Sequence, residues 1–342
     1  MESTAWDESI YSNTFDYYTS DNSSDVSNLC EMDDLSLFSS LLTTILYSLA
    51  FLFSLQGNSL VLWILMKYEN LTSLTNVFIM NLCISDLVFS CMLPFWIVYS
   101  LYGWIFGDVL CKAVNAVFSI SYYSGIFCVT MMTILRYLLV VNPLSTLRTH
   151  TRQYGVQASL IIWTFSILIV VPEIMYTQKQ PDFEDRFICD YSDKYWKDLD
   201  RYLRIVSFLF SFIVIVYCYL RILTILLKSR SQRKQRTVRL ILIIVVSFIF
   251  SWAPYNIVSL MLSFPSKSCE FERNINIAFY ISRKIAFSHC CLNPVLYVFV
   301  GVKFRRHLRH LCSHYWTCMN GPVASPKNSS HGKFHYEDAS IY

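Results

Sequence analysis

Residues 111–137 read CKAVNAVFSISYYSGIFCVTMMTILRY and decide the fold of this chain. From Ala113 to Leu135 the stretch holds 23 uncharged residues. As an α-helix they are about 35 Å long, enough to span the roughly 30 Å apolar core of a bilayer. Cys111 precedes the run and the pair Arg136-Tyr137 follows it. The sequence therefore predicts a transmembrane helix with a distinctive marker at each end.

Six further apolar runs flank this one. The chain is 54% hydrophobic and 15% charged, whereas soluble domains carry about 25% charged residues. The seven predicted runs are about 35–66, 73–102, 113–135, 153–172, 205–227, 240–264 and 275–302. We therefore expect an all-α membrane protein, a seven transmembrane helix bundle whose two termini lie on opposite sides.

The distribution of charge predicts which segments lie outside the cell and which lie in the cytoplasm. Residues 1–34 contain nine acids and no Lys or Arg, whereas basic residues gather at 148–152, 228–239 and 303–309. Basic loops stay in the cytoplasm, so the acidic head 1–34 is expected outside and disordered. The membrane domain is then 35–302. Residues 303–312 are expected to form a short amphipathic cytoplasmic helix and 313–342 a flexible tail.

Four cysteines fall outside the membrane in this topology: Cys30, Cys111, Cys189 and Cys269. Four cysteines in an oxidising compartment allow three pairings. We expect Cys111–Cys189, which ties the third helix to the long segment 174–204, and Cys30–Cys269, which ties the head to the start of the seventh helix. Asn22-Ser23-Ser24 is a glycosylation sequon on the same side.

Asp86 is the one acid deep inside an apolar run, where a charge needs a partner or a bound cation. Asn58, His289 and Asn293 lie at compatible depths. A sodium or proton site and a hydrogen-bonded packing cluster are both open. The chain has no Gly-rich phosphate loop, no HExxH motif and no repeated acid pair, so we expect no enzyme and no cofactor besides this possible sodium ion.

Six motifs in order resemble the rhodopsin-like G-protein-coupled receptors over residues 35–311. They are Gly57-Asn58, Leu82-x-x-x-Asp86, Arg136-Tyr137, Trp163, Trp252-x-Pro254 and Asn293-Pro294-x-x-Tyr297. Within that class the chain resembles the chemokine receptor family. The features are the acidic, tyrosine-bearing head, the pair Cys30 and Cys269, Trp104-x-Phe106-Gly107 and His289-Cys290-Cys291. The strings 57–63, 143–148 and 299–305 are most similar to the XC class of that family.

The resemblance implies a basic chemokine ligand bound outside and a heterotrimeric G protein of Gi type activated inside. It further implies arrestin as a partner, calcium signalling, chemotaxis and a multi-pass place in the plasma membrane, with no nucleic acid. The ligand-binding residues expected from it and from helix depth are Tyr11, Asp16, Tyr17, Tyr18, Trp96, Tyr99, Phe118, Glu173, Tyr255, Tyr280 and Arg283. The expected switch residues are Arg136, Tyr137, Tyr219, Trp252, Pro254, Asn293, Pro294 and Tyr297.

The chain departs from the family pattern at three informative places. Leu135 stands where an acid usually precedes the arginine, so we expect raised basal activity. Gly125 replaces a small polar residue near Asp86, which argues against sodium. Arg283 replaces an acid of the seventh helix and needs an acceptor, for which Glu173, a backbone carbonyl and the incoming ligand are the options.

Two other functions compete with a signalling receptor. A chemokine-scavenging receptor would internalise its ligand without a G protein, and such receptors lose the motifs of the inner face. A transporter or channel would show inverted repeats or several intramembrane charges, whereas only Asp86 lies deep here.

Overall fold

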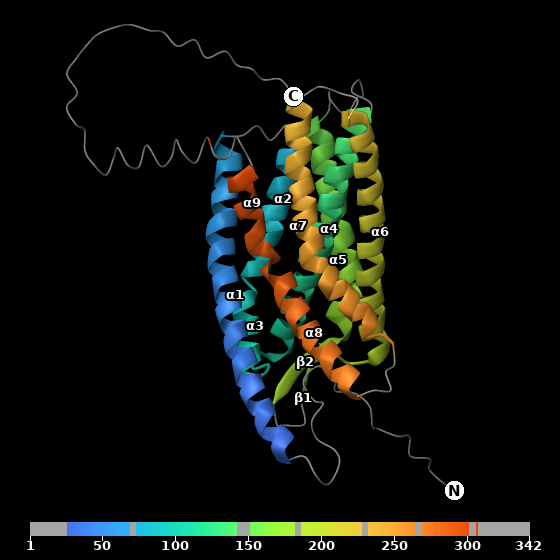
Figure 1. The fold of residues 1–342 in the computed structure, drawn as a ribbon. Helices are drawn as coiled ribbons and strands as arrows, with labels where there is room; N and C mark the ends of the chain where they lie inside the picture. Colours follow the sequence, from blue (N-terminus) through green and yellow to red (C-terminus); the bar gives the residue numbers. More distant parts are fainter. Residues whose placement is uncertain are drawn as a thin grey trace, which may run out of the picture.

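The computed structural model describes residues 26–68, 73–141, 151–181, 186–227, 232–264, 269–300 and 306. The helices are α1 (Val26–Tyr68), α2 (Leu74–Ser90), α3 (Leu93–Tyr102), α4 (Gly107–Val141), α5 (Thr151–Tyr176), α6 (Lys194–Leu227), α7 (Gln232–Met261), α8 (Cys269–Phe287), the 3-10 helix η2 (Ser288–Cys291) and α9 (Leu292–Val300). A hairpin of β1 (Thr177–Pro181) and β2 (Phe187–Tyr191) lies at one end of the bundle (Figure 1). We call this the hairpin end and the opposite one the Arg136 end.

The predicted seven-helix bundle is confirmed. α2 with α3 forms one crossing, and α8, η2 and α9 follow one another along another (Figure 1). Within the described residues, six helical stretches are long and apolar enough to span a membrane. The α8–η2–α9 crossing is not among them because it is broken, and because α8 carries Arg283 and Lys284 among its charges.

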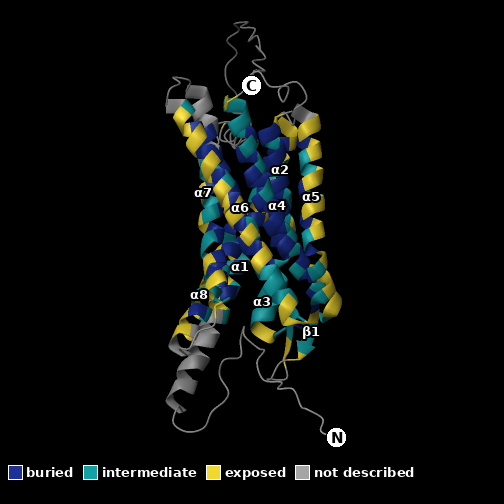
Figure 2. Ribbon diagram, turned by 90° about the vertical axis from the view of Figure 1, so that its right-hand side faces the viewer, coloured by how far each residue is buried: buried dark blue, intermediate teal, exposed yellow. Residues whose placement is uncertain are grey.

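The helix that contains the stretch 111–137 is the central one. α4 contacts α2, α5, α6 and α7 as well as the β1 strand. Figure 2 shows buried residues facing inward on α2 and α4, while exposed residues lie on the outer faces of α5 and α6. Apolar side chains on these outer faces fit a lipid environment, since there is no water there from which to withdraw them.

The interruption of the seventh crossing follows from Pro294. A proline ring clashes with the carbonyl four residues earlier and offers no N–H, and that carbonyl belongs to Cys290. Asn58 of α1 donates to it instead, at 2.9 Å. Beside it, a Cβ on Gly57 would lie 2.6 Å from Cγ of Pro294. The motif Gly57-Asn58 of α1 therefore packs directly against the Asn293-Pro294 motif of the seventh crossing.

The structure differs most from the predicted boundaries at the starts of α6 and α1. α6 begins at Lys194, so the segment 174–204, predicted as a loop, is a hairpin followed by three turns of helix. Charged pairs one turn apart, such as Asp200 with Arg204 at 2.7 Å, support a helix that hydropathy alone ends too early. α1 begins at Val26, inside the predicted head. The predicted 303–312 helix and 313–342 tail lie outside the described residues, apart from Arg306.

Candidate functional site

The hairpin is fastened to α4 by a disulfide. Cys111 of α4 is bonded to Cys189 of β2, with 5.6 Å between their Cα atoms, so this predicted pairing is confirmed. Oδ1 of Asp108 accepts a hydrogen bond from the backbone N–H of Lys179 at 3.0 Å. The side chains of Cys30 and Cys269 are not described, and their pairing stays a prediction.

The motif Trp104-x-Phe106-Gly107 holds the loop before α4 against the hairpin. The backbone N–H of Trp104 donates to the carbonyl of Phe187 at 2.6 Å, and its indole N–H donates to the carbonyl of Gly107 at 2.7 Å. Gly107 has φ +81°, a conformation that other residues rarely adopt. The buried indole packs beside Cys111. The motif therefore stabilises the attachment point of the disulfide.

Five aromatic side chains form a layer below the hairpin, which we call the aromatic floor: Trp96, Phe118, Trp252, Tyr255 and Phe287. Phe287 lies between Trp96, at 5.5 Å between ring centroids, and Phe118, at 4.9 Å. Trp252 contacts Phe118 at 6.1 Å and Tyr255 at 6.0 Å. The structure thus brings together three predicted ligand residues, and Tyr99 joins them through Trp96.

Arg283 lies at the α8 side of the aromatic floor. Its guanidinium carbon is 5.8 Å from the ring of Trp96 and 5.8 Å from the ring of Tyr280, a cation–π arrangement. Arg283 lies close enough to Tyr47 of α1 to interact with it electrostatically, while its Nε has no hydrogen-bond partner within the described part of the chain. The hydroxyl groups of Tyr280 and Thr43 are hydrogen-bonded to each other, with 2.7 Å between the oxygen atoms.

Glu173, one option for pairing with Arg283, pairs instead with Arg204 of α6, at 3.3 Å. Arg204 also forms an ion pair with Asp200 and donates a hydrogen bond to the hydroxyl of Ser119. Its guanidinium carbon lies 4.9 Å from the centre of the Phe118 ring. Sequence reasoning missed Arg204 and Asp200 because it placed them in a loop. The signal that would have found them is their spacing of four residues just before an apolar run.

Trp252 connects the aromatic floor to the middle of the bundle. It lies 4.9 Å from the ring of His289. Nε2 of His289 is 3.4 Å from Oδ1 of Asp86, and Asn293 donates to Oδ2 of Asp86 at 2.7 Å. A continuous set of contacts therefore runs from the aromatic floor to the Asn293-Pro294 motif.

The surroundings of Asp86 fit a sodium ion poorly. Both of its carboxylate oxygens already face nitrogen atoms, of His289 and of Asn293. Gly125 offers no side-chain oxygen, and the space beside it is filled by the ring of Phe248. Oxygen ligands are what hard cations need. Sodium binding stays an untested prediction, and the geometry favours a hydrogen-bonded cluster.

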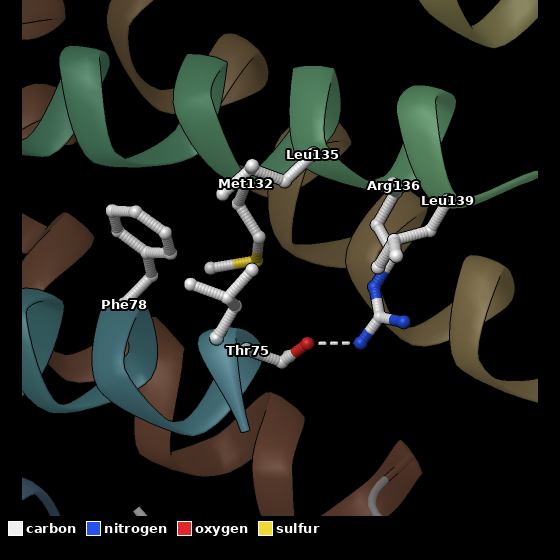
Figure 3. A pocket seen from close by; sticks show the side chains of 7 residues that line it. Thr75, Phe78, Met132, Leu135, Arg136 and Leu139 are labelled. Carbon is white, nitrogen blue, oxygen red and sulfur yellow. Dashed lines mark hydrogen bonds between the residues drawn. The ribbon is translucent and has the colours of Figure 1, made fainter. Parts of the chain in front are cut away.

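The Arg136 end contains an unexpected hydrogen bond. Arg136 donates to the hydroxyl of Thr75 on α2, as Figure 3 shows. These two residues and the buried Leu135 line a small, partly open cavity, together with Leu74, Phe78, Met132 and Leu139. Thr75 was not among the predicted switch residues. Leu135 leaves Arg136 without a carboxylate next to it, and the hydroxyl of Thr75 serves as an acceptor.

The structure also describes the surroundings of the remaining predicted switch residues. Pro254 is inside α7, two residues after the buried Trp252. Tyr219 and Tyr297 are both buried, and Tyr219 interacts electrostatically with Arg136. Tyr137 contacts the ring of Tyr217 at 6.2 Å. Tyr11, Asp16, Tyr17, Tyr18 and Asn22 lie outside the described residues.

Comparison with known proteins adds the family. The family described as "7 transmembrane receptor (rhodopsin family)" matches residues 57–297. The chain is 49% identical over 311 residues to Chemokine XC receptor 1 of Homo sapiens, covering 90% of this chain and 92% of that protein. It is 47% identical to the receptor of the same name from Mus musculus, covering 93% and 96%, and 35% identical to C-C chemokine receptor type 4 of Homo sapiens, covering 90% and 86%.

Proposed function

This chain belongs to the rhodopsin family of seven-transmembrane receptors, and within it to the chemokine receptors; from that premise we propose that it is a signalling receptor for a chemokine of the XC class. It is a multi-pass membrane protein that binds chemokines and is not an enzyme. The finer statements are proposals: the XC class of the ligand, Gi as the G protein and arrestin as a further partner.

The observation that carries the proposal is the unbroken series of contacts from the aromatic floor to Asp86 and Asn293 in the middle of the bundle. The aromatic floor lies under a disulfide-fastened hairpin, and Trp252 continues it to His289 and Asp86. A ligand that moves Phe118 or Tyr255 changes the packing around Trp252. A packed helix bundle has discrete arrangements rather than continuous ones, so such a change shifts a population between two states.

We also propose the orientation: the hairpin end outside the cell and the Arg136 end in the cytoplasm. The acidic residues 1–34 precede the apolar part of α1, and α1 begins at the hairpin end of the bundle (Figure 1). The basic segments 148–152 and 228–239 follow α4 and α6 at the Arg136 end. The positive-inside rule supports this arrangement.

A panel of purified chemokines, including the XC class, tests the proposal in transfected cells. Suppression of cAMP that pertussis toxin blocks, together with a calcium response to an XC-class chemokine, is the expected result. A scavenging receptor would internalise the chemokine and give neither response. The absence of a response to every chemokine in the panel, at confirmed surface expression, contradicts the proposed ligand class.

The acidic head is expected to contribute affinity through charge. Sulfated tyrosines would add negative charge to the head, and replacing Tyr11, Tyr17 and Tyr18 together by phenylalanine removes the hydroxyl groups that sulfation would modify. We expect chemokine affinity to fall about tenfold at low salt and less at high salt, because exposed charges are screened beyond about 8 Å at 0.15 M. Equilibrium binding at two ionic strengths measures this. Unchanged affinity of the triple variant at low salt would show that the head is only a spacer.

Arg283 is expected to act on signalling more than on capture of the ligand. Arg283→Ala removes the cation that lies over Trp96 and Tyr280 at the aromatic floor, while the head still binds the chemokine. We expect the concentration for half-maximal signalling to rise at least about tenfold, and binding to change less than about threefold; tenfold corresponds to about 1.4 kcal/mol. Equal losses in both measurements would indicate a structural role.

The predicted sodium ion beside Asp86 is open to a direct test. Replacing sodium by a large organic cation tests it directly. Given the nitrogen atoms that face Asp86, we expect binding of the chemokine to change little.

A further inference from the structure

The hydroxyl of Tyr122 lies where three helices meet. It is 3.0 Å from the backbone carbonyl oxygen of Arg204 on α6 and 3.2 Å from Oδ1 of Asn256 on α7. Tyr122 itself belongs to α4, and the three helices contact one another in pairs (Figure 1). The exposed fractions are 1% for Tyr122 and 3% for Asn256, so both side chains are shielded from solvent.

Both neighbours of this hydroxyl are hydrogen-bond acceptors. A carbonyl oxygen can only accept, and the amide of Asn256 is oriented by its own helix, because its Nδ2 donates to the carbonyl of Trp252 at 2.9 Å. Oδ1 is therefore the atom of Asn256 that faces Tyr122. A tyrosine hydroxyl has one proton, so at any moment this proton can be directed fully at α6 or at α7, but not at both.

The two acceptors differ in what else attaches their helices to α4. α4 and α6 are joined a second time at the same place, since Nη2 of Arg204 donates to Ser119, three residues before Tyr122, at 2.8 Å. On α7, the amide of Asn256 also binds the carbonyl of Trp252, and the ring of Trp252 packs edge-on against that of Tyr122 at 4.7 Å. Loss of the hydroxyl therefore weakens the attachment of α7 to α4 more than that of α6.

We propose that Tyr122 is a positioning residue of the receptor switch: its hydroxyl holds Asn256, and with it Trp252, in the arrangement of α7 described above. In the same arrangement Arg136 is bonded to Thr75 of α2, and we take it as the resting state. When the hydroxyl proton turns to the carbonyl of α6, α7 is released and the active state becomes easier to reach. This inference rests on the proposed signalling function, and it needs no contact between Tyr122 and the ligand.

Tyr122→Phe tests the hydroxyl, because it removes this group and keeps the ring against Trp252. We expect the ratio of active to resting receptor without ligand to rise about two- to tenfold, the usual effect of one neutral hydrogen bond. Ligand-free suppression of cAMP that pertussis toxin blocks, at matched surface expression, measures this ratio. The concentration of an XC-class chemokine for half-maximal signalling should fall by up to the same factor, because more of the receptor is already competent. A variant with a damaged fold would need more chemokine, not less.

Tyr123→Phe is the matched control. Tyr123 is the next residue of α4 and is equally buried, and its hydroxyl has no hydrogen-bond partner within the described part of the chain. The same substitution is thereby made with and without the loss of a hydrogen bond. We expect ligand-free signalling of this variant to equal that of the wild type, and a rise as large as that of Tyr122→Phe would overturn the inference.

Asn256→Leu tests the partner of the hydroxyl on α7. We expect it to raise ligand-free signalling in the wild type and to add less in the Tyr122→Phe background, because two residues of one hydrogen bond do not act independently. Equal effects in the two backgrounds would overturn the inference. If Tyr122→Phe does not reach the surface, Asn256→Leu decides alone by the same measurement.

Unchanged or lowered ligand-free signalling of Tyr122→Phe, at normal surface density, also overturns the inference. These results leave the proposed function standing, because the wild type still responds to its chemokine. Absence of any wild-type response to the chemokine panel overturns the proposed function, and this inference with it.

Discussion

Cys111→Ala and Cys189→Ala are each expected to abolish chemokine binding at the cell surface. The bond closes a loop with a sequence separation of 78 residues, and a disulfide of this span stabilises a fold by about 4 kcal/mol. That is a large part of the roughly 5–15 kcal/mol typical of folded proteins. Without it, only hydrogen bonds such as those of Asp108 and Trp104 hold the hairpin over the aromatic floor.

Binding of a labelled chemokine, with surface receptor counted separately by antibody, measures the loss. Cys91→Ala is the control, because Cys91 is exposed and has no disulfide partner, and it should bind as the wild type does. Either disulfide variant binding with wild-type affinity at normal surface density would contradict the expectation.

Leu135→Asp is expected to lower ligand-free signalling, and Thr75→Val to raise it. In the structure Arg136 is tied to α2 only through the neutral hydroxyl of Thr75, among the bonds described for it (Figure 3). Leu135 lines the same cavity, so an aspartate there can accept a hydrogen bond from Arg136. Hydrogen bonds to ionised acceptors are about twice as strong as neutral ones, so this state becomes more populated. Valine at position 75 removes the acceptor.

The expected size is that of a coupling free energy, about 1–3 kcal/mol, or roughly a 5- to 150-fold change in the ratio of active to resting receptor. Ligand-free suppression of cAMP at matched surface expression measures it. Thr130→Val is the control, because the hydroxyl of Thr130 bonds the carbonyl of Ile126 within its own helix. If Leu135→Asp leaves basal signalling unchanged or raises it, the restraint on the resting state lies elsewhere.

The sequence alone determined the seven crossings, because each apolar run is a local feature of the chain. It favoured the disulfide from Cys111 to Cys189 among three pairings, and the structure confirmed that choice. An apolar run long enough to span a bilayer excludes most other structures, since only a helix satisfies its own backbone in lipid. The motifs around Asp86, Trp252 and Pro294 occur at fixed depths on those helices, so their neighbours in space follow from their order along the chain.

Only the tertiary structure decided which polar side chains meet. Thr75 and Arg136 are 61 residues apart, and Glu173 and Arg204 are 31 apart. Whether such pairs meet depends on the rotation of each helix about its axis. That rotation is set by the packing of many side chains at once, and no local pattern records it. The same packing pairs Glu173 with Arg204 and not with Arg283. α5 and α6 are in contact, which brings Glu173 and Arg204 together, whereas Arg283 on α8 lies over the ring of Trp96.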